Sequence, residues 1–220
     1  FLPGDGAVVY DPSTGGIITM GRTFDRAGRI WAFPPTGGMG THLAGADSGT
    51  TADTLGSAAV FGAQSQIFVD NQGNVYFTEF SEHRLRMLRR NDLRVITLAG
   101  DGTPGDAGDG GLAVNAQLWF PRGVFGDPSG TTLYINDGGG DYLRALDLNT
   151  GIITRIDYPE DLFITHGMVD GSDFILTDIS VFNTWPRILR LSGGVLTTIT
   201  GGSPLDQASV PVQATSQRLQ

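Results

Sequence analysis

Residues 101–157 read DGTPGDAGDGGLAVNAQLWFPRGVFGDPSGTTLYINDGGGDYLRALDLNTGIITRID. This stretch contains four short runs that are rich in β-branched and aromatic residues, and turn-forming residues separate them. The runs are GVFGD (123–127), TTLYIND (131–137), YLRALD (142–147) and IITRID (152–157), and the turns are DPSG, DGGGD and LNTG. Four strands joined in order by tight turns predict one small antiparallel sheet.

The same layout recurs in both directions along the chain, with a period of roughly 45–57 residues. We predict four copies, at residues 1–45, 46–100, 101–157 and 158–202, with residues 203–220 leading into the next or the first copy. The second runs end in one acidic column, which comprises Glu79, Asp137 and Asp178, and the third runs begin with Arg29, Arg84, Tyr142 and Arg187. An alternative alignment of the first copy moves Arg29 into the second run. Repeats of this length with four strands each predict an all-β fold, a β-propeller of four-stranded antiparallel blades.

The composition agrees with an all-β chain. Its 220 residues include 33 Gly, 20 Asp and 14 Arg, but only 3 Glu and no Lys. Glu and Lys populate exposed helix faces, whereas Asp and Gly populate turns. The net charge is −9 and there is no basic run, which argues against nucleic acid and anionic membranes as partners. There is also no apolar run long enough for a transmembrane helix, so we expect no membrane insertion.

One succession of motifs resembles a known family. The stretch TLAGDGTPGDAGDGGLAVNAQLWFPRGV (97–124), a D-x-x-G hairpin, LYIND (133–137) and TGIIT (150–154) are similar to the NHL-repeat β-propeller family. The resemblance covers the whole chain and is most specific over residues 97–157. It implies a propeller of about six blades, of which this chain would supply four. The tail SVPVQATSQRLQ (209–220) resembles the lead-in LAVNAQLWF (112–120), so the alternatives are a closed four-bladed ring and an excerpt of a larger ring, and we expect the excerpt.

Recurring and non-recurring residues suggest different roles. A charge that recurs in a repeat protein usually serves the architecture, and a planar guanidinium suits bidentate pairing with a carboxylate. We therefore predict structural bridges among Arg29, Arg84, Arg187, Glu79, Asp137 and Asp178. Residues peculiar to one copy are better candidates for binding. These are His83, Tyr142, Phe182, Asn183 and Trp185.

Patterns for catalysis and cofactors are weak. Residues 100–105 fit G-x-G-x-x-G, but Pro104 and further turn residues prevent the helix that a dinucleotide site needs. Asp101, Asp106 and Asp109 carry the hard oxygen ligands that Ca²⁺ uses, although their spacing does not match a calcium loop and Asp-Gly turns are the commoner use. We expect no cofactor, with Ca²⁺ at these residues as the alternative.

These observations favour a non-enzymatic protein-interaction or structural module. We expect its partner to be another protein or neighbouring domains of a larger extracellular or cell-surface protein. Two alternatives stay open: a metal-dependent lyase or hydrolase with its site on the propeller axis, and a glycan-binding propeller that uses Trp185. Fold class alone decides none of these.

Overall fold

The chain folds into four consecutive antiparallel sheets. A computed structural model describes residues 7–22, 28–62, 64–127, 130–138, 142–157, 162, 164–178, 186–193, 195–201 and 212–213. Within these residues the only helical elements are two short 3₁₀ turns, η1 (Gly56–Ala58) and η2 (Ala113–Asn115). No helix in this described part is long and apolar enough to cross a membrane.

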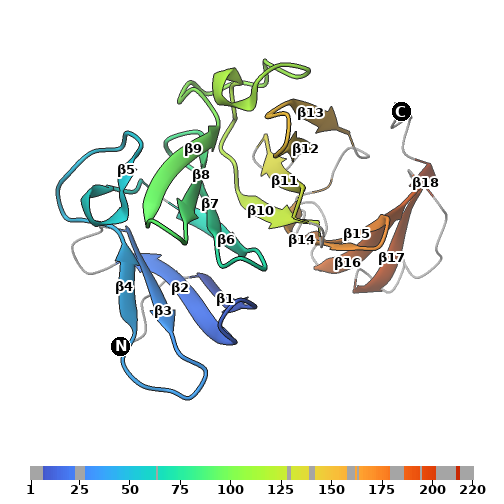
Figure 1. Ribbon diagram of the computed structural model, residues 1–220. Helices are drawn as coiled ribbons and strands as arrows, with labels where there is room; N and C mark the ends of the chain where they lie inside the picture. Colours follow the sequence, from blue (N-terminus) through green and yellow to red (C-terminus); the bar gives the residue numbers. More distant parts are fainter. Residues whose placement is uncertain are drawn as a thin grey trace.

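Each sheet is one blade of a propeller, and the blades follow one another along an arc (Figure 1). Blade 1 comprises β1 (Ala7–Asp11), β2 (Gly16–Arg22), β3 (Gly28–Phe33) and β4 (Thr41–Ala44). Blade 2 comprises β6 (Gln64–Val69), β7 (Val75–Glu79), β8 (Arg84–Arg89) and β9 (Arg94–Ala99), with β5 (Thr54–Leu55) added beside β9. Blade 3 comprises β10 (Gly123–Gly126), β11 (Thr132–Asp137), β12 (Tyr142–Asp147) and β13 (Ile153–Ile156). Blade 4 comprises β14 (Ile164–Asp170), β15 (Asp173–Asp178), β16 (Arg187–Ser192) and β17 (Val195–Gly201), with β18 (Val212–Gln213) beside β17. The predicted all-β propeller of four-stranded blades is confirmed.

The first strand of each blade lies innermost. Strands β1, β6, β10 and β14 contact one another in succession, so they line the axis, and the later strands of each blade lie farther out. The predicted register is also found: the Cα partners across the second hairpin are Glu79 with Arg84, Asp137 with Tyr142 and Asp178 with Arg187. Arg29 lies in the third strand of blade 1, opposite Gly21, so the alternative alignment of that copy is wrong.

Apolar residues on facing blades form three cores, one between each pair of neighbours. Strand β7 illustrates how one strand contributes to two cores, because all five of its residues are buried. Val75 and Phe77 belong to the core shared with blade 1, whereas Tyr76 belongs to the core shared with blade 3. A strand between two blades buries both faces, and the period-2 alternation of its side chains divides them between the two cores.

An aspartate ends or directly follows the inner strand of every blade. These residues are Asp11, Asp70, Asp127 and Asp170. In blade 2 the carboxylate of Asp70 accepts the backbone N–H groups of Gln72 and Asn74, as well as hydrogen bonds from Asn74 Nδ2 and Tyr76 Oη. Gly73 follows with a φ of 80°, which lies in the left-handed region that glycine adopts without strain. The side chain therefore fixes the shape of the first hairpin, as in an Asx turn.

Candidate functional site

In blades 2 and 3 the acidic residue that ends the second strand is buried and holds the chain that enters the blade. Glu79 and Asp137 are both fully buried. The backbone N–H of Gly62 donates to Glu79 Oε1 at 2.7 Å, and the N–H of Trp119 donates to Asp137 Oδ1 at 2.7 Å. Both donors lie in the segment just before the inner strand of the same blade. These two carboxylates therefore have an architectural role, in which each fixes the lead-in segment of its own blade.

The arginines that accompany this column differ in part from the predicted ones. Arg187 pairs with Asp178 as expected, with its Nε at 2.9 Å from Oδ2. In blades 2 and 3, however, the partners are Arg86, whose Nη1 lies 3.2 Å from Glu79 Oε2, and Arg144, whose Nη1 lies 3.6 Å from Asp137 Oδ2. Both lie two residues beyond the predicted position, on the same face of the strand. Arg29 instead pairs with Asp47, because blade 1 has Gly21 in place of the acid.

The other hydrogen bonds of Arg86 and Arg144 explain why these two arginines lie next to the acidic residues. Arg86 and Arg144 are fully buried, and each donates to carbonyl oxygens of the preceding lead-in segment. Arg86 Nη1 donates to the carbonyl of Thr51 at 2.7 Å, and Arg144 Nη1 donates to that of Gln117 at 2.6 Å. Arg84, at the strand end, lies against Gly102. The signal in the sequence was an arginine inside each apolar third strand, RLRMLR and YLRALD, where a charge is tolerated only if it is fully paired.

Only one carboxylate oxygen of Asp137 accepts a hydrogen bond, and the pKa of this buried carboxyl is raised. Its Oδ1 accepts the Trp119 N–H, but the 3.6 Å from Oδ2 to Arg144 is too long for a hydrogen bond. Burial is the largest cause of the shift, and it raises the pKa of Asp137 from 3.8 to about 6. Burial likewise raises the pKa of Glu79, although Gly62 and Arg86 oppose it.

We expect Asp137 to make stability depend on pH in a defined direction. Its folded-state pKa is about 6 and its ordinary value is 3.8, so over that interval the folded chain binds a proton that the unfolded chain releases. The stabilisation is therefore present below about pH 4 and is lost as the pH rises through 6. Chemical unfolding of the wild type and of Asp137→Asn, measured from pH 4 to pH 7.5, should show the wild type losing about 3 kcal/mol relative to the variant.

Asp147→Asn is the matched control for this titration. Asp147 ends the third strand of the same blade, and its pKa is lowered by hydrogen bonds from the Asn149 and Thr150 backbone. Its contribution to stability would be lost only as the pH falls below its ordinary value, so the difference from wild type should stay constant above pH 5. A constant difference for Asp137→Asn as well would show that the carboxyl of Asp137 does not titrate in this range.

His83 contributes to an aromatic cluster that joins blades 2 and 3. The residues in contact are Phe80, His83, Phe120 and Arg122, and we count the exposed Trp119, which precedes Phe120 in the chain, as the fifth member of the cluster. The N–H of Phe120 donates to His83 Nδ1 at 3.2 Å, and the two ring centroids are 4.6 Å apart. The ring centroids of Phe80 and Phe120 are 4.8 Å apart with the rings tilted, and the guanidinium of Arg122 lies 5.1 Å from the Phe80 ring centroid.

The backbone of this cluster is strained and its outer face is exposed. His83 and Phe120 have φ values of 54° and 49°, a conformation that costs energy for residues with a Cβ and is enriched at functional sites. Trp119 is 50% exposed and Phe120 is 37% exposed. Sequence reasoning selected His83 but missed Trp119 and Phe120, which it treated as part of a lead-in. Two large aromatic residues directly before Pro121 in a polar loop were the available signal.

Of the other predicted binding residues, the structure describes Tyr142, which is not part of this cluster. Tyr142 is buried, and the guanidinium of Arg155 stacks on its ring at 3.8 Å from the centroid. Burial raises the pKa of the Tyr142 hydroxyl. Phe182, Asn183 and Trp185 lie outside the described residues, so their placement stays a prediction.

The three calcium candidates have other contacts. The carboxylate of Asp109 accepts hydrogen bonds from Arg144 Nε and Nη2 at 3.1 and 2.9 Å, and Asp101 accepts the N–H of Thr103 at 2.6 Å. Asp106 lies 3.9 Å from Arg155. Among the residues that the structure describes, no group of three or more His, Cys, Asp or Glu side chains is arranged to hold a metal ion.

Comparisons with known proteins define the class of the fold. No protein-family model matches the chain. A 99-residue part, 45% of the chain, is 30% identical to Protein SUPPRESSOR OF QUENCHING 1, chloroplastic, of Arabidopsis thaliana, and spans 9% of that protein. A putative TolB from Agrobacterium tumefaciens superposes with a TM-score of 0.62 at 13% identity, over 89% of this chain and 66% of that one. Virginiamycin B lyase from Staphylococcus aureus, solved with quinupristin, superposes with a TM-score of 0.52 at 11% identity, over 97% of this chain and 72% of that one.

These structures are similar in fold alone, because their identities are far below 25%. The chain has a β-propeller fold, and its described residues form four blades. It spans less than a tenth of the curated relative and just under two thirds of the TolB structure.

Proposed function

We propose that the chain is a non-enzymatic interaction module of the NHL-repeat type, which binds a protein partner through the aromatic cluster. The carrying observation is that Trp119 and Phe120 present large exposed side chains from a backbone that His83 and Asp137 hold in place. Trp and Arg are enriched among residues that dominate interface energies, and preorganised contacts lose little entropy on binding. The NHL assignment rests on the residues at 97–157, where the lead-in, the D-x-x-G hairpin and the strands occur in the family's order.

The partner would be another protein or a neighbouring domain of the same larger protein, in an extracellular or cell-surface setting. Support for a larger protein comes from the small share of the curated relative that the chain spans. A metal-dependent lyase or hydrolase, a glycan-binding propeller and a calcium site stay predictions, since the likeness to a lyase concerns the fold alone.

We expect Trp119→Ala to weaken partner binding by about 30-fold or more, as a loss of at least 2 kcal/mol at an interface hot spot implies. A partner would first be identified by chemical cross-linking to the wild-type chain, and its Kd would then be measured with purified proteins. The thermal midpoint of the variant should stay close to wild type, because the Asp137 contact uses the Trp119 backbone and not its side chain.

Val114→Ala is the matched control, since Val114 is also an exposed apolar residue of the same lead-in segment but lies outside the cluster. It should leave the Kd within about twofold of wild type. An unchanged Kd for Trp119→Ala, or an equal loss for Val114→Ala, would rule out the aromatic cluster as the docking site.

A further inference from the structure

The inner strands of blades 2, 3 and 4 enclose a hollow at the end of the axis opposite the aromatic cluster. Its volume is about 330 Å³, which is sufficient for a small ligand. Residues 68–72 of blade 2, residues 125–127 and Gly130 of blade 3, and residues 167–169 of blade 4 line it. The aromatic cluster precedes β10, whereas this hollow lies at the other end of β10, so the two sites are separate.

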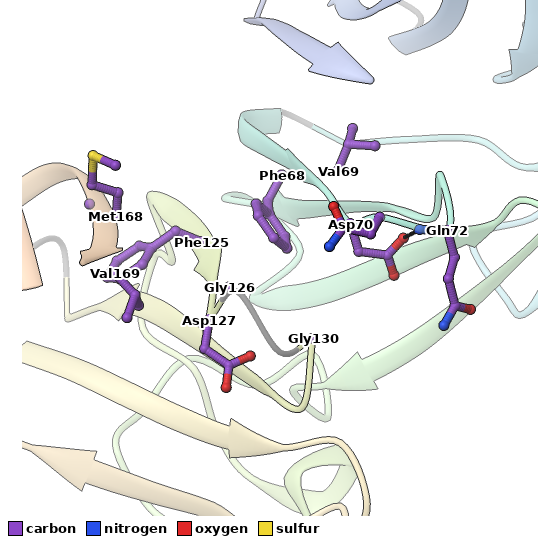
Figure 2. Close-up of a pocket in the computed structure, with 12 residues that line it drawn as sticks. Phe68, Val69, Asp70, Gln72, Phe125, Gly126, Asp127, Gly130, Met168 and Val169 are labelled. Carbon is purple, nitrogen blue, oxygen red and sulfur yellow. Dashed lines mark hydrogen bonds between the residues drawn. The ribbon is translucent and has the colours of Figure 1, made fainter. Parts of the chain in front are cut away.

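Two phenylalanine rings are fixed in the wall of the hollow, each against a glycine of the next blade. A Cβ atom on Gly126 would lie 2.4 Å from Cε1 of Phe68, and one on Gly167 would lie 2.3 Å from Cε1 of Phe125. Behind them, Phe68 packs on Tyr76 and Phe125 stacks on Tyr134, with centroid distances of 5.9 and 5.4 Å. The rings are therefore preorganised, and they form an apolar wall together with Met168 and Val169 (Figure 2).

The charged side chains among the lining residues are both carboxylates, Asp70 and Asp127. Figure 2 shows them where the chain leaves β6 and β10 and enters the following hairpins. Backbone and hydroxyl donors of the β10–β11 hairpin hold Asp127, since Thr131 N–H and Oγ1 and Thr132 N–H all donate to it. The side chain of Arg90 packs near this region against Gly73, and its positive charge acts on Asp11 of blade 1. Because both charged side chains of the lining are carboxylates, the hollow is suited to a cation.

The hydrogen bonds that Asp70 already accepts indicate which kind of cation the hollow can bind. Its two oxygens already accept four hydrogen bonds from their own hairpin, which fills the acceptor sites of a carboxylate. A metal ion or a primary ammonium needs direct oxygen ligands or acceptors, whereas a quaternary ammonium group needs neither. Quaternary ammonium ions are weakly hydrated and bind to aromatic faces through the ring quadrupole, assisted by nearby negative charge.

We propose that this hollow binds a quaternary ammonium group, with its alkyl substituents on the wall of Phe68, Phe125 and Met168 and its charge opposite Asp70 and Asp127. The site has the three components such a ligand requires: aromatic rings held in place, a net negative rim and a small apolar volume. The proposal does not depend on the aromatic cluster or on any protein partner.

Choline and its neutral isostere 3,3-dimethyl-1-butanol provide the test. An NMR titration would follow the backbone amide signals of Gly126 and Gly167 in ¹⁵N-labelled protein. We expect choline to shift both signals and to bind at least about fivefold more tightly than the isostere, with ammonium chloride at equal ionic strength without effect. Equal binding of the isostere would overturn the proposal. So would the absence of a shift when choline is present at 50-fold excess over a Kd of about 1 mM.

Two variants and a control locate the binding. Asp127→Asn keeps an oxygen for the Thr131 and Thr132 N–H groups and should weaken choline binding by about fivefold or more. Phe68→Leu should weaken it by about two- to fivefold, the range of an exposed cation–π contact. Asp147→Asn removes the same charge from a similar turn that does not line the hollow and should change nothing. If Asp147→Asn weakens binding as much as Asp127→Asn, the net charge of the protein and not the hollow attracts the cation, and the proposal fails.

Discussion

Replacing Arg144 with methionine should lower the free energy of unfolding by about 3–5 kcal/mol, because it leaves the carboxylate of Asp137 buried without its cation. The same change removes the hydrogen bonds to Asp109 and to the carbonyls of Gln117 and Ala107, which hold the lead-in segment of blade 3. For a domain of this size the thermal midpoint should fall by about 10 °C or more. Circular dichroism during heating measures this directly.

Arg89→Met is the control for this variant. Arg89 also lies on the third strand of its blade, but it is 41% exposed and pairs with the exposed Asp92. Its loss should lower the midpoint far less than Arg144→Met does, because solvent screens an exposed ion pair. We also expect Asp137→Asn to recover part of the loss when added to Arg144→Met, since the unpaired buried charge is then gone. Equal midpoints for Arg144→Met and Arg89→Met would show that the buried arginine does not hold the blade.

Phe77→Ala should be similarly destabilising, by about 3–5 kcal/mol, as is usual for truncating a fully buried aromatic side chain. Phe77 lies in the core between blades 1 and 2, where its ring meets that of Phe61 edge to face with centroids 5.0 Å apart. The midpoint of unfolding in urea reports the loss. Val8→Ala serves as the control, because Val8 is 68% exposed on β1 and should change stability by less than about 0.5 kcal/mol. A loss below about 1 kcal/mol for Phe77→Ala would show that the two blades are not packed as described.

The sequence was sufficient to predict the blades and their register. Each hairpin has its own turn residues, and a strand that is joined to its neighbour by a short turn has little freedom in its pairing. The pairing of Glu79 with Arg84 and of Asp178 with Arg187 across the second hairpin follows from such local information. Local information also placed Arg29 in the third strand of blade 1.

The buried ion pairs could not be predicted in the same way. Arg84 and Arg86 lie on one face of β8, so alternation cannot tell which of them reaches Glu79. The choice is made by the lead-in segment, whose carbonyls at Thr51 and Ala52 bind the guanidinium of Arg86. That segment is more than 30 residues away along the chain, and its path depends on packing between blades. The aromatic cluster and the axial hollow depend on the same kind of long-range contact, so their composition was not visible in any one repeat.

The lead-in segments also determine where the sheets can grow. Before it reaches the axis, the chain of blade 2 pairs β5 with the outermost strand β9, and in blade 3 Leu112 forms a bridge to Ile152 at the same edge. Unpaired outer strands are the usual templates for adding a strand from another molecule, which is how many β-proteins aggregate. The segments that anchor the buried arginines therefore also block strand addition in these two blades, and a variant such as Arg144→Met should release an edge and make the protein prone to aggregation as well as less stable.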